Sequence, residues 1–142
     1  MELPDENEWR FVAVLNKTAS IGTLMNALGH MSAGLAAHCP EDMRFLNYAD
    51  ADGQAHPHIS HFPFIVLSAK NSQALRRLRN EARERDMVCT DFVETMRIGT
   101  TAEQLEATAN TAEADHQYLG VCLFGKTHEL REITKRFSLF SG

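Results

Sequence analysis

Four segments of the chain are rich in apolar, β-branched and aromatic residues, and each is short enough to be one strand. They are WRFVAVLN at 9–16, FPFIVLSA at 62–69, MVCTDFVETM at 87–96 and YLGVCLFG at 118–125. Short apolar runs of this kind are typical of strands that are covered on both faces of a sheet. Turn residues at Asp52–Gly53 indicate that two further extended pieces form a hairpin before the second segment.

The segments between these strands carry apolar residues at every third or fourth position, which predicts amphipathic helices. The expected helices cover Gly22–His38, 71–87, 102–111 and 126–137. The first is expected to end at Pro40. Asn71 or Ser72 is the expected N-cap of the second helix, and Thr100 or Thr101 that of the third. This alternation predicts an α/β domain whose sheet is mixed or mostly parallel and covered by helices.

A length of 142 residues fits one domain, which we place at 9–142 after a flexible polar lead at 1–8. The lead lacks the apolar core of a signal peptide, and no segment approaches the roughly 20 apolar residues that span a bilayer. The three cysteines are widely spaced and form no CxxC motif, which favours reduced thiols. We therefore expect a soluble cytoplasmic protein with no metal, no cofactor and no membrane contact.

The net charge of −5 gives a nucleic acid no general attraction, so such a partner would need a local basic patch. The one dense basic stretch is the second helix together with Lys70. Its arginines are Arg76, Arg77, Arg79, Arg83 and Arg85. Glu81 and Glu84 interrupt this stretch and no aromatic residues lie within it. A solvated helix face is therefore favoured over a surface that binds nucleic-acid phosphates.

The helix expected at Gly22–His38 has two different faces. Its core face carries large apolar residues such as Leu24, whereas the opposite face is small and polar. Asn26 and His30 lie one turn apart on the polar face, among glycines that weaken a helix unless something packs closely against them. Two interpretations stay open. Either these two side chains line a functional pocket, or they only form hydrogen bonds with neighbouring loops.

Polar side chains also follow the first strand, in the stretch NKTAS at Asn16–Ser20. In open α/β sheets, ligands and anions collect where a strand ends and a helix begins. Lys17, Thr18 and Ser20 are suitable groups for this task, although the stretch is not a P-loop.

Three histidines, His56, His58 and His61, lie in the stretch AHPHISH. In an extended segment the first two face the same way, with Asp50 and Asp52 upstream, so a two-histidine metal edge is geometrically feasible. The spacing matches no zinc or calcium signature. We therefore prefer loop histidines without a metal.

Taken together, these segments resemble the bacterial family known as domain of unknown function 2000. The resemblance runs from Trp9 to Phe140 and rests on VAVLN, NALGHMSAGL, DADGQAHPHIS, PFIVLSA, DFVETM, YLGVCLFG and TKRFSLF. The fold of that family is similar to that of type II peptidyl-tRNA hydrolases. The resemblance implies a four-stranded mixed, mostly parallel sheet with helices on both faces.

The chemistry of these hydrolases matches the chain only in part. His30 corresponds to the histidine of the hydrolase motif, and Gly22 to one of its glycines. Thr23 stands where the functional lysine is expected, and Ala27 stands where the glutamine is expected. Because the chain is also acidic, hydrolysis of peptidyl-tRNA is our third hypothesis rather than our first.

Our leading hypothesis is that the domain binds a small or peptide-like ligand in a cleft beside the first helix. After the third strand, the nearest acid is Glu94 or Asp91. The expected ligand-binding residues are Asn16, Lys17, Thr18, Asn26 and Thr95, and the candidate catalytic residues are His30 and Glu94. His30 and Glu94 would share proton transfer if the protein is an enzyme. The second hypothesis is a non-catalytic homodimer that assembles through the small-residue helix face.

Overall fold

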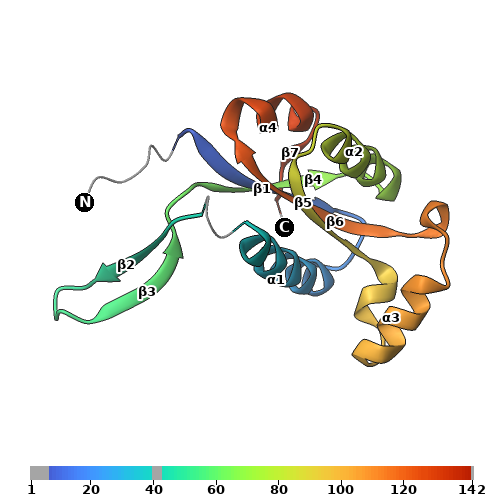
Figure 1. Ribbon diagram of the computed structural model, residues 1–142, viewed down its shortest axis with the longest axis horizontal. Coiled ribbons are helices and arrows are strands. Elements are labelled where there is room, and N and C mark those ends of the chain that lie inside the picture. Colours follow the sequence, from blue (N-terminus) through green and yellow to red (C-terminus); the bar gives the residue numbers. More distant parts are fainter. Residues whose placement is uncertain (1–6, 40–42, 142) are drawn as a thin grey trace.

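The computed structural model describes residues 7–39 and 43–141, which form a five-stranded sheet with helices on both faces and a separate two-stranded hairpin (Figure 1). In chain order the elements are β1 (Trp9–Asn16), α1 (Ile21–His38), β2 (Phe45–Ala49), β3 (Ala55–Ser60), β4 (Phe64–Ala69), α2 (Ser72–Glu84), β5 (Val88–Val93), the 3-10 turn η1 (Glu94–Arg97), α3 (Thr101–Ala109), the 3-10 turn η2 (Glu113–Asp115), β6 (Tyr118–Lys126), α4 (Thr127–Thr134) and β7 (Ser138–Leu139). The order of strands in the large sheet is β5-β6-β1-β4-β7.

The central strand β1 divides the core into two parts, because successive side chains of a strand point to opposite faces. Phe11, Ala13 and Leu15 belong to the cluster that α1 covers, whereas Val12 and Val14 belong to the cluster under α2 and α4. The helices contribute their own buried stripes: Leu24, Ala27, Met31 and Leu35 from α1, Leu75, Leu78 and Ala82 from α2, and Leu130 and Ile133 from α4. The predicted sheet with helices on both faces is confirmed.

Two parts of the sheet prediction are wrong. The sheet has five strands rather than four, because Ser138–Leu139 pairs with β4 as β7. It is mixed but not mostly parallel, since β1 and β4 form the one parallel pair among the described strands. A two-residue strand is too short to carry a hydrophobic pattern. For β6 to run parallel to β5, the chain between them would have to cross a face of the sheet. The helix in that connection, α3, buries no residue and lies beyond the end of the sheet, so β6 returns antiparallel to β5 (Figure 1).

Helices α2 and α3 begin at the capping residues that the sequence predicts. At the start of α2, the Asn71 side chain accepts a hydrogen bond from a backbone N–H of the first turn. Thr100 and Glu103 form a capping box at the start of α3. The predicted helix stop at Pro40 lies outside the described residues, as do residues 1–6 of the polar lead.

The predicted hairpin is confirmed as β2 and β3, which pair antiparallel and extend away from the rest of the molecule (Figure 1). Its turn is organised by Asp50, whose Oδ1 accepts hydrogen bonds from the backbone N–H groups of Asp52 and Gln54, both at 3.0 Å. Gly53 has a φ of +79°, a conformation that favours glycine.

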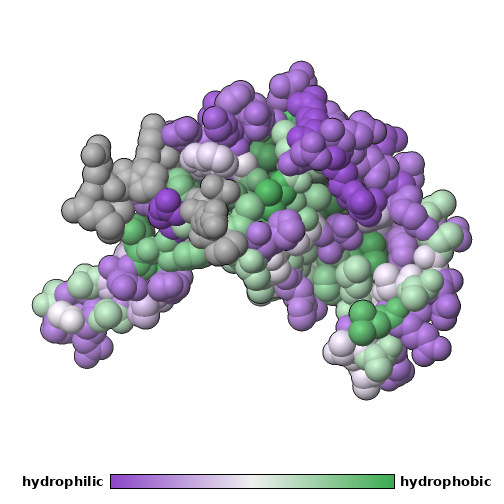
Figure 2. All heavy atoms as spheres, in the orientation of Figure 1, coloured by the Kyte–Doolittle hydropathy of each residue, from purple (hydrophilic) through white to green (hydrophobic). Residues whose placement is uncertain are grey.

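The surface over α2 and α4 is hydrophilic (Figure 2). Several of its arginines are ion-paired: Arg76 with Glu113 at 2.9 Å, Arg79 with Asp91 at 3.1 Å, and Arg85 with Glu81 and Glu132, both at 3.3 Å. The interrupted charge pattern of the second helix thus gives a solvated, ion-paired face. Within the described residues, no helix has both the length and the apolar character needed to cross a membrane.

Candidate functional site

The two parallel strands β1 and β4 lie side by side, and the chain continues from their carboxyl ends to opposite faces of the sheet. After Asn16 it continues into α1 on one face of the sheet, and after Ala69 it continues into α2 on the other face. In α/β sheets, ligands bind at the carboxyl ends of strands where the following helices separate in this way. This arrangement directs the search for a site to the carboxyl ends of β1 and β4.

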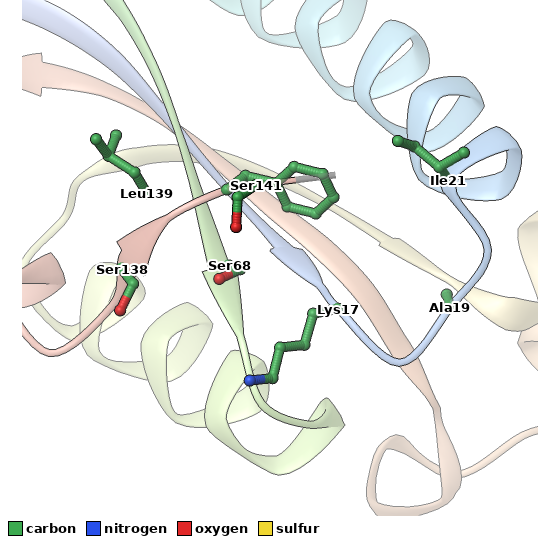
Figure 3. Close-up of a pocket in the computed structure, with 8 residues that line it drawn as sticks. Lys17, Ala19, Ile21, Ser68, Ser138, Leu139 and Ser141 are labelled. Atoms are coloured by element: carbon green, nitrogen blue, oxygen red, sulfur yellow. The ribbon is translucent and has the colours of Figure 1, made fainter.

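A cavity of about 340 Å³ opens at this point (Figure 3). It is lined by Lys17, Ala19, Ile21, Ser68, Ser138, Leu139, Phe140 and Ser141. We call it the α1-side compartment, because it reaches the first turn of α1. Figure 3 shows the Lys17 side chain extending from the end of β1 toward β4, with Ser68 and Ser138 nearby.

A second cavity of about 260 Å³ continues toward α2 and shares Lys17, Ser68 and Ser138 with the first. Its remaining lining residues are Lys70, Asn71, Ala74, Arg77, Arg136 and Phe137. We call it the α2-side compartment, and the two compartments together the β1–β4 cleft. A ligand that fills this cleft would lie across the carboxyl ends of β1 and β4 and reach both the α1 side and the α2 side of the sheet.

Asn16 and Thr18 hold the loop that carries Lys17. The Asn16 side chain is buried, and its Oδ1 accepts hydrogen bonds from the backbone N–H of Thr18 at 3.0 Å and from the Thr18 hydroxyl at 2.6 Å. The backbone N–H of Lys17 donates to the carbonyl oxygen of Ala69 at 3.0 Å. These bonds fix the end of β1 against β4 and leave the exposed Lys17 side chain directed at the cleft.

Asn26 and His30 lie together, as their spacing predicts, but on the exposed face of α1. They share an open depression with Met25, Gly29 and Ala33, and this depression has no described lining residue in common with the β1–β4 cleft. The His30 ring stacks on Phe92 with their ring centroids 5.7 Å apart.

Glu94 and Thr95 lie in η1, directly after β5. Arg97 pairs with Glu94 at 2.5 Å and also donates to the hydroxyl of Thr23 in α1 at 3.4 Å. Glu94 therefore lies on the α1 side of the sheet, the side that also carries His30. The Thr95 hydroxyl is 2.7 Å from that of Thr108 and joins η1 to α3. The structure thus groups Asn16, Lys17 and Thr18 in one place and Asn26 with His30 in another, with η1 beside the start of α1.

The small-residue face of α1 is open. A Cβ at Gly22 or Gly29 would meet no atom within 4 Å, and one at Gly34 would meet only Thr90 at an ordinary 3.7 Å. Close packing within the described part of the chain therefore does not explain the first two glycines.

The histidine-rich segment is built into the hairpin. His56 pairs with Asp50 at 2.8 Å, and His58 stacks on Phe45 with ring centroids 5.4 Å apart. The pairing of β2 with β3 shifts register beside His58, which has a φ of 100°, so the strand alternation behind the predicted two-histidine edge is interrupted there. Over the described ranges, no group of three or more His, Cys, Asp or Glu residues could hold a metal ion.

No disulfide joins Cys39, Cys89 or Cys122, all of which lie in the described part of the chain. Burial is the largest cause that raises the pKa of Cys122 to about 12 and also raises the pKa of Cys89. Both thiols are therefore protonated at neutral pH and unsuited to nucleophilic chemistry, as expected for cysteines inside apolar strands.

Among the lining residues of the cleft, Lys17 is the one that was predicted as a site residue. The polar and charged lining residues that were not predicted are Ser68, Lys70, Asn71, Arg77, Arg136, Ser138 and Ser141. Lys70 could have been predicted from the sequence, because it directly follows a predicted strand, as Lys17 does. Ser138 could not, since β7 itself could not be predicted.

The fold defines the chain as a single α/β domain with a mixed sheet between two layers of helices. A family model described as a protein of unknown function (DUF2000) matches residues 9–141, so the chain belongs to that family. Among solved structures, it is similar to a protein of unknown function, Atu0240, from Agrobacterium tumefaciens, with a TM-score of 0.81 and 20% sequence identity over 94% of this chain and 98% of that chain. No curated protein matched the sequence.

Proposed function

We propose that this domain binds a small or peptide-like ligand in the β1–β4 cleft. The observation that carries the proposal is the position of the cleft, at the carboxyl ends of the parallel strands from which α1 and α2 separate. The α1-side compartment, at about 340 Å³, falls in the range of small-molecule sites, which is about 300–1,000 Å³.

The residues around the cleft divide into binding and positioning groups. Lys17 contacts the ligand, because its side chain is exposed in both compartments. Asn16 and Thr18 act by fixing the Lys17 loop through their mutual hydrogen bonds. The hydroxyls of Ser68 and Ser138 add neutral donors and acceptors on the β4 and β7 side.

A fragment screen monitored by protein NMR tests the proposal. We expect some fragments to shift the amide signals of Ala19, Ile21 and Phe140. A Ser138→Trp substitution places an indole at the junction of the two compartments, at an exposed position that tolerates it, and should abolish these shifts. Ala109→Trp, at the exposed end of α3, is the matched control and should leave binding unchanged. Fragments that bind the Ser138→Trp variant as well as the wild type would contradict the proposal.

A second candidate function is proton-transfer chemistry by His30 and Glu94, with Asn26 and Thr95 as ligand contacts. The observation in its favour is the Arg97 side chain, which links Glu94 to Thr23 in the first turn of α1. A diverged peptidyl-tRNA hydrolase would place its reaction here. Turnover of peptidyl- or aminoacyl-RNA by the wild type, and none by a His30→Ala variant, would support this candidate. Equal rates for the two proteins would exclude it.

A third candidate is a homodimer formed through the exposed face of α1. Met25 on this face is 66% exposed, and the glycines beside it are uncovered. Sedimentation of the wild type against Gly29→Leu and Ala33→Leu tests the assembly. Loss of a dimer with the fold intact would support the candidate, whereas a wild-type monomer would remove it.

A further inference from the structure

We propose that the α2-side compartment of the β1–β4 cleft binds the phosphate group of a small organic phosphate monoester. This inference rests on the proposed function, because it names the class of ligand that the same cleft takes. The α2-side compartment would hold the charged group, and the α1-side compartment would hold the organic part.

Basic side chains surround the α2-side compartment. Its nine lining residues include four cations, Lys17, Lys70, Arg77 and Arg136, and no carboxylate. The whole protein has a net charge of −5 and only 14 lysines and arginines. The lining of this cavity is thus positively charged although the protein as a whole is negatively charged. Such a lining suits a group that carries more than one negative charge.

Unlike Arg76 and Arg79 of α2, which are ion-paired, three of the four cations of the cleft have no carboxylate partner among the described residues. Lys17, Lys70 and Arg77 form no ion pair with a carboxylate anywhere in residues 7–39 and 43–141. Arg136 donates to the carbonyl oxygen of Ile133 at 3.2 Å and lies 3.7 Å from a carboxylate oxygen of Glu81, a long contact. Three of these four charges are therefore available to an anion without breaking an existing pair.

The neutral groups at the junction of the compartments match the same ligand. Ser68 and Ser138 oppose each other across the β4–β7 pair, and both line the two compartments. Their hydroxyls can donate to phosphate oxygens, which accept several hydrogen bonds at once. Beyond them, Ile21, Leu139 and Phe140 offer apolar contacts to the organic part of the ester, in an α1-side compartment whose lining is otherwise mostly polar.

Phenyl phosphate, benzoate and phenol are suitable probes, because they share a ring and differ in charge. We expect phenyl phosphate to shift the amide signals of Lys17, Ser68 and Lys70 in a saturable way, and to bind more tightly than benzoate or phenol. Added salt should weaken the binding of phenyl phosphate and leave that of phenol unchanged.

Charge-removing variants on exposed positions give the sharper test. Lys70→Ala and Arg77→Ala should each weaken the binding of phenyl phosphate by about tenfold or more, because each variant loses a charge-assisted hydrogen bond. Arg83→Ala is the matched control, because it removes the same charge from an exposed position of the same helix, outside the cleft. It should leave the affinity within about twofold of wild type.

The outcomes separate this inference from the proposed function. If phenol binds the cleft as tightly as phenyl phosphate and Arg77→Ala changes neither, the phosphate assignment is overturned while binding in the cleft stands. If benzoate binds more tightly than phenyl phosphate, the group is a carboxylate and the assignment is again overturned. If none of the three probes shifts a cleft amide, the phosphate assignment is overturned, and the fragment screen with Ser138→Trp decides the proposed function separately.

Discussion

The side-chain amide of Asn16 donates a hydrogen bond to the backbone carbonyl oxygen of Tyr118, at 3.0 Å and across 102 positions of the sequence. This bond joins the carboxyl end of β1 to the start of β6, directly beside the cleft. Asn16 also accepts two hydrogen bonds from Thr18. One buried side chain therefore fixes both the contact between β1 and β6 and the loop that carries Lys17.

Replacing Asn16 by alanine should therefore destabilise the fold. The change removes three hydrogen bonds and leaves the buried Tyr118 carbonyl without this donor, so we expect a loss of about 2–3 kcal/mol in the free energy of unfolding. Urea unfolding measures this loss. Asn26→Ala is the matched control, since Asn26 is exposed on α1, and it should change stability by less than about 0.5 kcal/mol. Equal effects of the two variants would show that the Asn16 bonds contribute little.

Tyr118 is the second group for which the structure predicts a measurable property. Burial and the hydrogen bond to Glu113 at 2.7 Å raise the pKa of its phenol from 10.0 to about 12. A pKa that is raised in the folded state contributes stability that is complete below the ordinary value and is lost as the pH rises through the folded value. We therefore expect stability to fall between about pH 10 and pH 12. Absorbance titration of the phenolate and unfolding curves over this range measure both effects.

Tyr118→Phe is the control for that prediction. It keeps the ring, over which the Arg76 guanidinium lies at 5.2 Å, and removes only the titrating hydroxyl. The variant should lose the absorbance step near pH 12 and the part of the alkaline stability loss that belongs to this residue. A step near pH 12 that persists in the variant would assign it to another group.

Most elements of the fold could be predicted, because each has a local signal. The alternation of Phe11, Val12 and Ala13 places side chains in both halves of the core, and β1 was predicted as a strand covered on both faces. The cap at Thr100 and the turn at Asp52–Gly53 are equally local. The direction of a strand has no such local signal, because it depends on whether the connection before the strand crosses a face of the sheet. The connection that contains α3 does not cross a face, so β6 runs antiparallel to β5.

The site was harder to predict than the fold, for a related reason. Lys17 was identified because it follows a strand, and the structure places it in the cleft. Its partners come from β4, α2 and the last strand, and only the observed pairing of β4 with β1 and β7 brings them together. Asn26 and His30 were identified from helical spacing, which predicts that two side chains share a face but not what that face meets.

Gly29 tests whether the open face of α1 is covered in solution. A Cβ at this position would meet no atom within 4 Å, so in an isolated chain Gly29→Ala should stabilise the helix by about 0.5–1 kcal/mol. Thermal or urea unfolding of a dilute sample measures this gain. A loss of stability that grows with protein concentration would instead show that another copy packs against this glycine.

Gly120 in β6 should behave in the opposite way. A Cβ at this position would lie 2.6 Å from Cε of Met31 in α1 and 3.0 Å from Cδ2 of Leu15 in β1. The absence of a side chain thus lets α1 pack directly on the sheet. Because the crowding atoms are the far ends of flexible side chains, Gly120→Ala should cost about 1 kcal/mol, the low end of the range for overpacking.

A double-mutant cycle with Met31→Ala identifies the cause of that cost. Met31→Ala alone leaves a cavity and should cost about 2–5 kcal/mol. In the double variant the new methyl group enters the space that the methionine vacates, so its cost should be clearly smaller than the sum of the two single costs. Strictly additive costs would show that Gly120→Ala acts through the backbone of β6 rather than through its contact with α1. The comparison would then locate the strain in the strand instead of the helix–sheet interface.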